Sequence, residues 1–340
     1  MRPVAAIAFL LFATLLRAQG PQPPIIDMHL HAVGADANGP APTAICAPLS
    51  EMPLAETGER WASEFIAWLK SPTCTDSVWG PRTDQEVMEQ TLATLRRRNI
   101  FGVTSGPPPL LERWRQAGGD RIIPSLWFGF MLESIPTPAE VRRSFTEKRY
   151  AVFSEVAIQY DGISPSDAMF EPYLAVAEEL DVPIGIHVGP GPPGVLYLPG
   201  TGNYRARLHS PLVIEDALAR HPKLRVYLMH AGWPMLDDLL AVLYAHPHLH
   251  VDVGVISYVL PRQEFHRYLQ RITEAGFGKR VMFGSDQMNW PLAIDVAIQA
   301  IETAPFLTAE QKRDILFNNA ARFLRLSPEQ VAAMHEKREP

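Results

Sequence analysis

The segment IIDMHLHA, residues 25–32, places two histidines, His29 and His31, at the end of an apolar run. Residues two apart in a β-strand point to the same side, so we expect both imidazoles to face one way. Asp27 has the same spacing and could fix a ring or satisfy a main-chain group. An H-x-H pair is often two surface histidines, but buried imidazoles need partners, and a shared metal ion is the simplest one.

Short apolar runs alternate with longer amphipathic segments over the rest of the chain. We expect strands over 25–31, 100–106, 121–128, 151–160, 182–189, 224–232, 249–255 and 280–287. A helical segment precedes each strand after the first, and most strands are continuous apolar runs, as in parallel strands covered on both faces. This order predicts an α/β fold, a (β/α)8 TIM barrel, with helices over 308–337 capping the barrel.

Three predictions concern individual helices and the segment after the first strand. Thr83 and Glu86 form a capping box that predicts a helix over 83–99. A second helix is expected over 164–181, with Ser164 as its N-cap. Residues 32–82 are rich in proline and are expected to be irregular, apart from one helix around ERWASEFIAWLK.

Near its N-terminus the chain has Arg2, then a thirteen-residue apolar run from Val4 to Leu16, and then the small residue Ala18. This order is typical of a secretory signal peptide over 1–18, and the run is shorter than the ~20 residues that a membrane span needs. We therefore expect an exported protein, periplasmic or secreted, with one domain over 19–340. Cys46 and Cys74 could pair in an oxidising compartment or remain separate thiols, and the sequence leaves both readings open.

The formal net charge is -6 and the chain has no basic run, which argues against a nucleic-acid partner. No membrane association is expected once the leader is removed. The expected partner is a small-molecule substrate. The oligomeric state stays open, a homo-oligomer included.

Three more polar residues stand at the ends of later strands: His187, His230 and Asp286. The carboxyl ends of barrel strands converge on one face, which is where active sites of this fold lie. Each residue alone could be a hydrogen-bonded histidine or a helix cap. A chance arrangement that puts all three at the same end is much less expected, so the sequence predicts one shared site.

The motifs DMHLH, IGIHVG, LMHAG and MFGSD, with the tail NNAARFL, together resemble the metal-dependent amidohydrolase superfamily. The closest likeness is to the amidohydrolase-related (amidohydrolase 2) branch, which contains hydrolases and decarboxylases. The resemblance implies a metal site built from His29, His31, His187, His230 and Asp286. Glu155 lies where two-metal members place a bridging carboxylate; its alternative is a carboxylate paired with another group inside the barrel.

This resemblance implies a metal-dependent hydrolase that uses one or two divalent ions, most simply zinc, to activate water against an ester, lactone or amide carbonyl. Asp286 and His230 would be catalytic, with Asp286 moving the proton. The alternative is a decarboxylase on the same barrel, and a third class is a binding protein that kept only the fold. In the loop after His187, candidates for substrate contact are Tyr204, Arg205 and Arg207, although such arginines are as often solvated.

Overall fold

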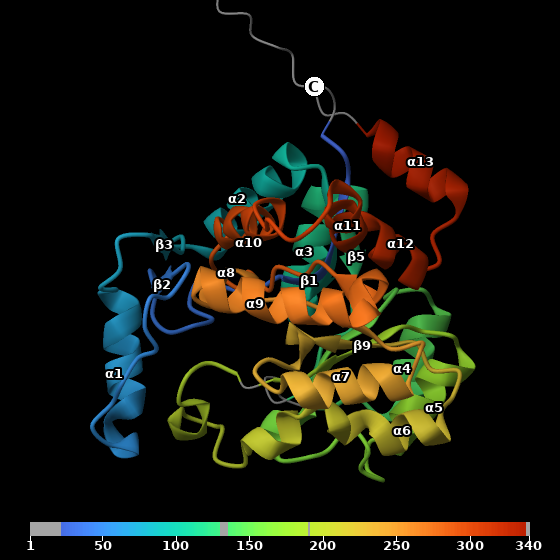
Figure 1. The fold of residues 1–340 in the computed structure, drawn as a ribbon, viewed down its shortest axis with the longest axis horizontal. Helices are drawn as coiled ribbons and strands as arrows, with labels where there is room; N and C mark the ends of the chain where they lie inside the picture. Colours follow the sequence, from blue (N-terminus) through green and yellow to red (C-terminus); the bar gives the residue numbers. More distant parts are fainter. Residues whose placement is uncertain (1–21, 130–134, 190, 338–340) are drawn as a thin grey trace, which may run out of the picture.

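The computed structural model describes residues 22–129, 135–189 and 191–337, and its central feature is a parallel β-barrel (Figure 1). Within these ranges the barrel strands are β1 (Ile25–His31), β4 (Ile100–Ser105), β5 (Ile122–Pro124) with β6 (Phe128–Gly129), β7 (Phe153–Ala157), β8 (Ile184–His187), β9 (Val226–Met229), β10 (His250–Asp252) and β11 (Val281–Met282). They pair in the orders β1-β4-β5 and β11-β10-β9-β8-β7-β6. The predicted TIM barrel is confirmed, with β5 and β6 together making its third strand.

Contacts between the two sheets close the barrel. The N–H of Met28 in β1 donates to the carbonyl of Phe283, just after β11, at 2.9 Å. On the other side, Ser125 forms a parallel bridge with Val152, between β5 and the start of β7. The ends of all the strands are therefore held in one ring, which brings residues distant in sequence to a common mouth.

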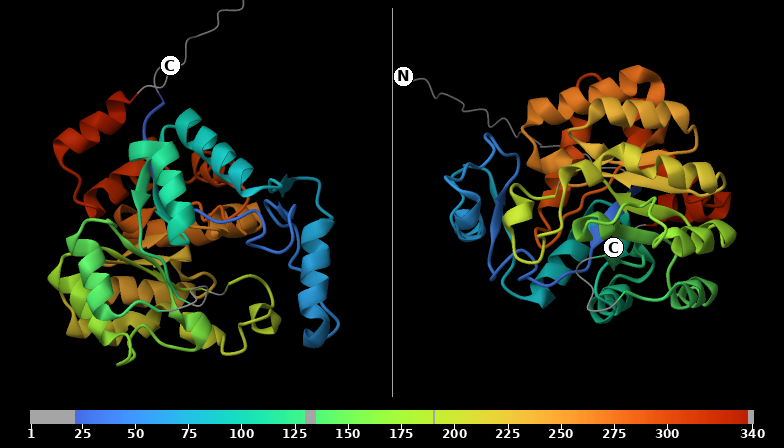
Figure 2. Two further views of the ribbon diagram at one scale, coloured as in Figure 1. Left: turned by 180° about the vertical axis from the view of Figure 1, so that it is seen from behind. Right: turned by 90° about the horizontal axis from the view of Figure 1, so that it is seen from below.

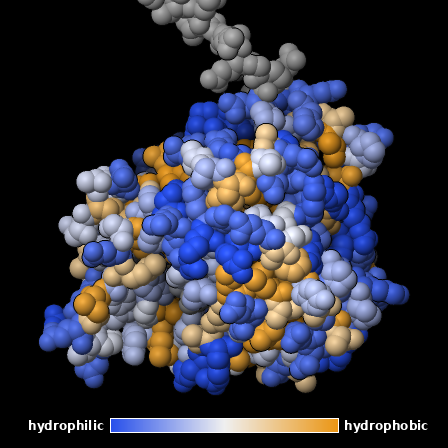
Figure 3. All heavy atoms as spheres, viewed as in Figure 1, coloured by the Kyte–Doolittle hydropathy of each residue, from blue (hydrophilic) through white to orange (hydrophobic). Residues whose placement is uncertain are grey.

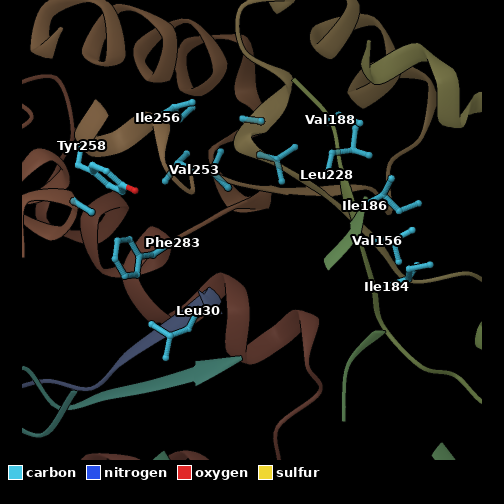
Figure 4. Close-up of a cluster of buried hydrophobic side chains, with 14 of the residues drawn as sticks. Leu30, Val156, Ile184, Ile186, Val188, Leu228, Val253, Ile256, Tyr258 and Phe283 are labelled. Atoms are coloured by element: carbon cyan, nitrogen blue, oxygen red, sulfur yellow. The ribbon is translucent and has the colours of Figure 1, made fainter. Parts of the chain in front are cut away.

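Helices surround the strands and cover their outer faces (Figures 1 and 2). They are α2 (Asp84–Arg97), α3 (Pro108–Gly118), α4 (Pro138–Thr146), α5 (Glu171–Glu179), α6 (Glu215–Arg220), α7 (Leu236–Ala245), α8 (Ile256–Val259), α9 (Arg262–Ile272) and α10 (Ala293–Glu302). Figure 4 shows Ile184, Ile186 and Val188 on one side of β8, in the apolar layer that the helices cover. His187 alternates with these residues and so points the other way.

The helix starts show where local signals are reliable. The capping box of Thr83 and Glu86 is present at the start of α2, as predicted. The prediction of Ser164 as an N-cap is wrong, because α5 begins only at Glu171. Pro172 explains the difference, since proline fits the first turn of a helix but would remove a hydrogen bond and clash inside one.

The C-terminal helices close the barrel at the end opposite the mouth, which confirms the predicted cap. They are α11 (Ala309–Arg313), α12 (Asn319–Phe323) and α13 (Pro328–Glu336). Phe317 and Phe323 join one buried cluster with Ile26 and Tyr227, from the first residues of their strands. Burial of this apolar plug leaves the other end of the barrel for polar groups.

An irregularity in β1 decides which way its side chains point. The pairing of β1 with β4 shifts register between Asp27 and Leu30. Ile26 belongs to the buried cluster under the C-terminal helices, whereas Ile25 and Leu30 belong to the outer layer. Strict alternation would have put Ile25 and Leu30 on opposite faces, so the shift reverses the pattern within the strand.

The segment between β1 and α2 is more ordered than the sequence predicted. β2 (Ala44–Cys46) pairs antiparallel with β3 (Ser77–Trp79), and the predicted helix is present as α1 (Gly58–Lys70). Cys46 and Cys74 form a disulfide across this segment. Both views of Figure 2 show α1 standing apart from the barrel helices, and Trp61 of α1 donates a hydrogen bond to the carbonyl of Pro193 at 2.8 Å.

Removal of the disulfide is expected to destabilise the protein measurably. The bond closes a loop of sequence separation 28, and a cross-link of this size contributes about 2–4 kcal/mol, largely by restricting the unfolded chain. The Cys46→Ser/Cys74→Ser variant should lose about that much free energy of unfolding in a denaturant titration. Equal stability of the wild-type protein with and without reductant, or two free thiols in native protein, would contradict this expectation.

The predicted signal peptide over 1–18 lies outside the described residues. In residues 22–337, apart from the two short gaps, we find no helix of the length and apolarity needed to cross a membrane. Figure 3 shows one face of the molecule, where hydrophilic residues are interspersed with smaller apolar patches.

Candidate metal centre

The barrel strands bring together all six predicted metal-site residues, five of them at or near the carboxyl ends of their strands. Asp286 Oδ1 lies 3.1 Å from His31 Nε2 and 3.7 Å from His29 Nε2. Asp286 Oδ2 lies 3.8 Å from His230 Nδ1, and His230 Nε2 lies 3.1 Å from His187 Nδ1. Each of these five side chains is almost fully buried, so the site lies inside the barrel mouth and not on the surface.

Glu155, from the middle of β7, lies between two pairs of histidines. Its Oε2 is 3.6 Å from His31 Nε2 and 3.9 Å from His29 Nε2. Its Oε1 contacts His187 Nδ1 and lies 3.8 Å from His230 Nε2. One carboxylate thus presents a different oxygen to each pair, as a bridging ligand would.

Three of the histidines have their outer ring nitrogen held by a neighbour. His29 Nδ1 donates to Asp252 Oδ2 at 3.2 Å, and His230 Nδ1 donates to the carbonyl of Gly254 at 3.1 Å. His31 Nδ1 lies 3.1 Å from Ser105 Oγ. Such contacts fix the tautomer and orientation of metal-binding histidines, leaving Nε2 of each ring toward the centre.

Asp252 is a functional residue that the sequence analysis missed. It is fully buried at the end of β10, and its Oδ1 accepts the N–H groups of His230 at 3.0 Å and Gly254 at 2.8 Å. The same rule that selected Asp286, a carboxylate at the end of an apolar strand, would have selected Asp252 in HVDVG. One carboxylate therefore orients two of the histidines.

The pKa values of the buried carboxylates in the site shift in opposite directions. Burial tends to raise the pKa of Glu155, but His187 and hydrogen bonds from nearby histidines hold it well below its usual range. Burial likewise opposes ionisation of Asp252, and His29 still lowers its pKa. Asp27 differs, because burial raises its pKa to about 6. Glu155 and Asp252 are therefore ionised beside the histidines of the mouth.

The sequence predicts that Asp27 either fixes a histidine ring or satisfies a main-chain group, and the structure shows that it satisfies main-chain groups. Its Oδ1 accepts the N–H groups of His29 at 3.0 Å and Ser285 at 2.8 Å. Gln287 makes a similar link, since its amide exchanges two hydrogen bonds with the main chain of His31. These contacts join β1 to the segment that carries Asp286.

Tight backbone turns place the two catalytic candidates. His230 has φ of 58° and Asp286 has φ of 52°, in the left-handed region that most residues avoid. Glycine is required beside them at position 254, because a Cβ there would lie 2.7 Å from His29 Nδ1. The chain bends sharply at the strand ends, which turns both side chains toward the centre.

These residues fit a divalent metal. Donor atoms within 4.8 Å of one another form three overlapping groups: His29, His230 and Asp286; His29, His31 and Glu155; Glu155, His187 and His230. In the described part of the chain, His29 Nε2 and Asp286 Oδ1 are buried and have no hydrogen-bond partner. Buried imidazole and carboxylate atoms without partners are costly, and a cation would satisfy them together.

The three residues predicted to contact substrate differ in burial and in their position relative to the site. Arg205 and Arg207 are exposed, and Arg205 donates to the carbonyls of Gly202 and Tyr204. Tyr204 is buried, with its ring 4.5 Å from that of His209, which in turn lies 5.4 Å from His187. Tyr204 thus reaches the edge of the site through His209, and the role of all three in substrate binding stays a prediction.

Comparison with known proteins gives the family. The family model described as Amidohydrolase (Amidohydro_2) matches residues 26–326. The chain belongs to this amidohydrolase family. No curated protein sequence matches the chain.

Solved structures similar to this amidohydrolase agree on the fold. An uncharacterised TIM-barrel protein from Bordetella bronchiseptica is 17% identical over 91% of this chain and 99% of its own, with a TM-score of 0.58. A probable 2-pyrone-4,6-dicarboxylic acid hydrolase from Acinetobacter baumannii is 13% identical over 89% and 99%, with a TM-score of 0.53. A 2,6-dihydroxybenzoate decarboxylase from Rhizobium is 14% identical over 89% and 99%, with a TM-score of 0.50.

At these identities the likeness concerns the fold alone, and the same fold carries hydrolysis and decarboxylation. Family and site together make this amidohydrolase a metal-dependent enzyme, and its family implies small-molecule substrates.

Proposed function

We propose that this amidohydrolase hydrolyses an ester, lactone or amide of a small molecule with two divalent ions, most simply zinc. The observation that carries the proposal is the position of Glu155, with Oε2 toward His29 and His31 and Oε1 toward His187 and His230. An ionised carboxylate between two pairs of imidazoles fits two cations better than one, because it reduces their mutual repulsion. A two-metal site suits hydrolysis.

His29, His31 and Asp286 would hold one ion and His187 and His230 the other, with Glu155 between them. When bound, such ions acidify water and polarise a carbonyl oxygen. Asp286 is the group that moves the proton. Its main chain is held on both sides: its N–H donates to the carbonyl of His29 at 2.6 Å, and its carbonyl accepts from Tyr258 Oη at 2.7 Å.

With its main chain held in this way, Asp286 can take a proton from the attacking water and return it to the leaving group. His230, whose Nδ1 is held by the Gly254 carbonyl, presents Nε2 to the same space. The carbonyl carbon would be attacked on the side that faces Asp286.

The alternative is decarboxylation of a small carboxylic acid on the same barrel, and one experiment separates the two. Purified protein is depleted of metal, reloaded with Zn²⁺, and tested with lactones, aryl esters, N-acyl compounds and hydroxybenzoates in H₂¹⁸O. Hydrolysis places ¹⁸O in the product carboxylate and requires the restored metal. Release of CO₂ from the benzoates, with no ¹⁸O-labelled product from the other compounds, would establish the decarboxylase instead.

We also propose that the protein is exported, periplasmic or secreted. The Cys46–Cys74 disulfide supports this location, because such bonds persist in oxidising compartments. N-terminal sequencing of the native protein should begin near Gln19. An intact Met1 on protein recovered from the cytoplasm would reject the proposal.

A further inference from the structure

One of the four histidines in the metal centre lacks a partner for its outer nitrogen. The rings of His29, His31 and His230 are each held from outside, by Asp252, Ser105 and the Gly254 carbonyl. His187 is turned the other way, with Nδ1 toward Glu155 and Nε2 pointing outward. This Nε2 is buried and has no hydrogen-bond partner among the described residues.

An imidazole that gives its Nδ1 lone pair to a cation must carry its proton on Nε2. That N–H then needs an acceptor, since leaving a buried donor unpaired costs about 1–3 kcal/mol. Metal-binding histidines almost always donate this second N–H to a carboxylate, a carbonyl or another acceptor. An acceptor for the Nε2–H of His187 is therefore expected next to this ring.

His209 is the neighbour with acceptor capacity. Its ring lies next to that of His187, with ring centroids 5.4 Å apart and planes at 87°. Two imidazoles joined by an N–H···N hydrogen bond of about 3 Å have ring centres about 5 Å apart, because each ring adds its own radius. Neither ring nitrogen of His209 has a hydrogen-bond partner of good geometry in the described part of the chain.

The surroundings of His209 hold its ring in place. The residue is fully buried, and its ring packs against Tyr160 at 5.2 Å and Tyr204 at 4.5 Å. Its carbonyl accepts the N–H of Gly189 at 2.7 Å, which ties it to the end of β8. A neutral imidazole keeps one nitrogen free to accept a hydrogen bond.

We propose that His209 is a positioning residue that accepts a hydrogen bond from Nε2–H of His187 and holds the His187 ring with Nδ1 toward Glu155 and the metal. His209 belongs to none of the three donor groups, so it acts through His187 and not as a ligand. The inference rests on the metal centre of the proposed function and not on the reaction that this centre performs.

The test compares two substitutions at position 209. His209→Phe keeps a flat ring and removes the acceptor, whereas His209→Gln supplies an amide oxygen that can accept from His187. His266→Phe is the matched control, because His266 is a half-buried histidine on α9 that bonds the Ala300 carbonyl away from the site. Metal-depleted protein is titrated with Co²⁺ and followed by its visible absorption, and release to a chelator is timed.

We expect His209→Phe to weaken the binding of one Co²⁺ equivalent by about 10–100-fold and to change its absorption spectrum. His209→Gln should restore most of the affinity, and His266→Phe should match the wild type. Melting of the metal-free proteins separates this effect from loss of folding. Wild-type cobalt affinity and spectrum in His209→Phe, or equal losses in the Phe and Gln variants, would overturn the proposal.

Failure of the proposed function is a separate result. One outcome is that cobalt binds as expected and the variants differ as stated, while the loaded enzyme releases CO₂ and hydrolyses nothing. That result would support the role of His209 and reject the proposed hydrolase function.

Discussion

Asp286→Asn is expected to lower the turnover of the metal-loaded enzyme by about 10²–10⁴-fold, which is the usual contribution of a general acid–base group. Asparagine keeps the size of the side chain but cannot take a proton from water. The main-chain contacts of residue 286 to His29 and Tyr258 do not involve the carboxylate, so the local fold should persist. Steady-state rates on the best substrate of the panel give the measurement.

A second measurement separates the proton-moving role of Asp286 from a role as ligand. Metal content is determined on the same preparations, and Asp295→Asn serves as the control, since Asp295 pairs with Arg97 on the outside of the barrel. Loss of turnover with metal retained supports the acid–base role. Turnover within a few-fold of the wild type would show that another group moves the proton.

Glu155→Gln should reduce bound metal from two equivalents to one or fewer and lower activity by about 100-fold or more. The substitution keeps the shape of the side chain but removes the charge that separates the two pairs of histidines. Without this charge, two cations in one buried site repel each other more strongly, and the second should be lost. Elemental analysis after dialysis measures the stoichiometry directly.

Glu178→Gln is the matched control for this experiment. Glu178 also pairs with a histidine, since its Oε2 lies 2.9 Å from His221 Nδ1, but the pair lies outside the metal centre. Two equivalents are expected in this variant, as in the wild type. One equivalent in both the wild-type protein and Glu155→Gln would mean that Glu155 does not bridge, and would favour the decarboxylase.

Local sequence patterns were sufficient to predict the fold and most residues of the site, because each pattern has a direct physical cause. Parallel strands covered on both faces need continuous apolar runs, so strands such as 182–189 are visible without a structure. A polar residue that ends such a run, as His187, His230 and Asp286 do, must face the barrel mouth. The capping box at Thr83 is equally local, because its hydrogen bonds span only three residues. The helix start predicted at Ser164 is wrong because a capping residue is only a local signal. A helix that began there would have Pro172 in its interior, where proline removes a hydrogen bond.

The sequence by itself thus determined the barrel, its C-terminal cap and the residues that meet at its mouth. Only the tertiary structure decided what surrounds them. The disulfide between Cys46 and Cys74 depends on the antiparallel pairing of two three-residue strands, β2 and β3, which are too short to be recognised in the sequence. Likewise, the register shift in β1 turns Asp27 away from the histidine rings, Asp252 orients His29 from β10, two strands away, and His209 lies beside His187. Each depends on contacts between segments distant in the chain, and no local pattern encodes which side chains will meet there.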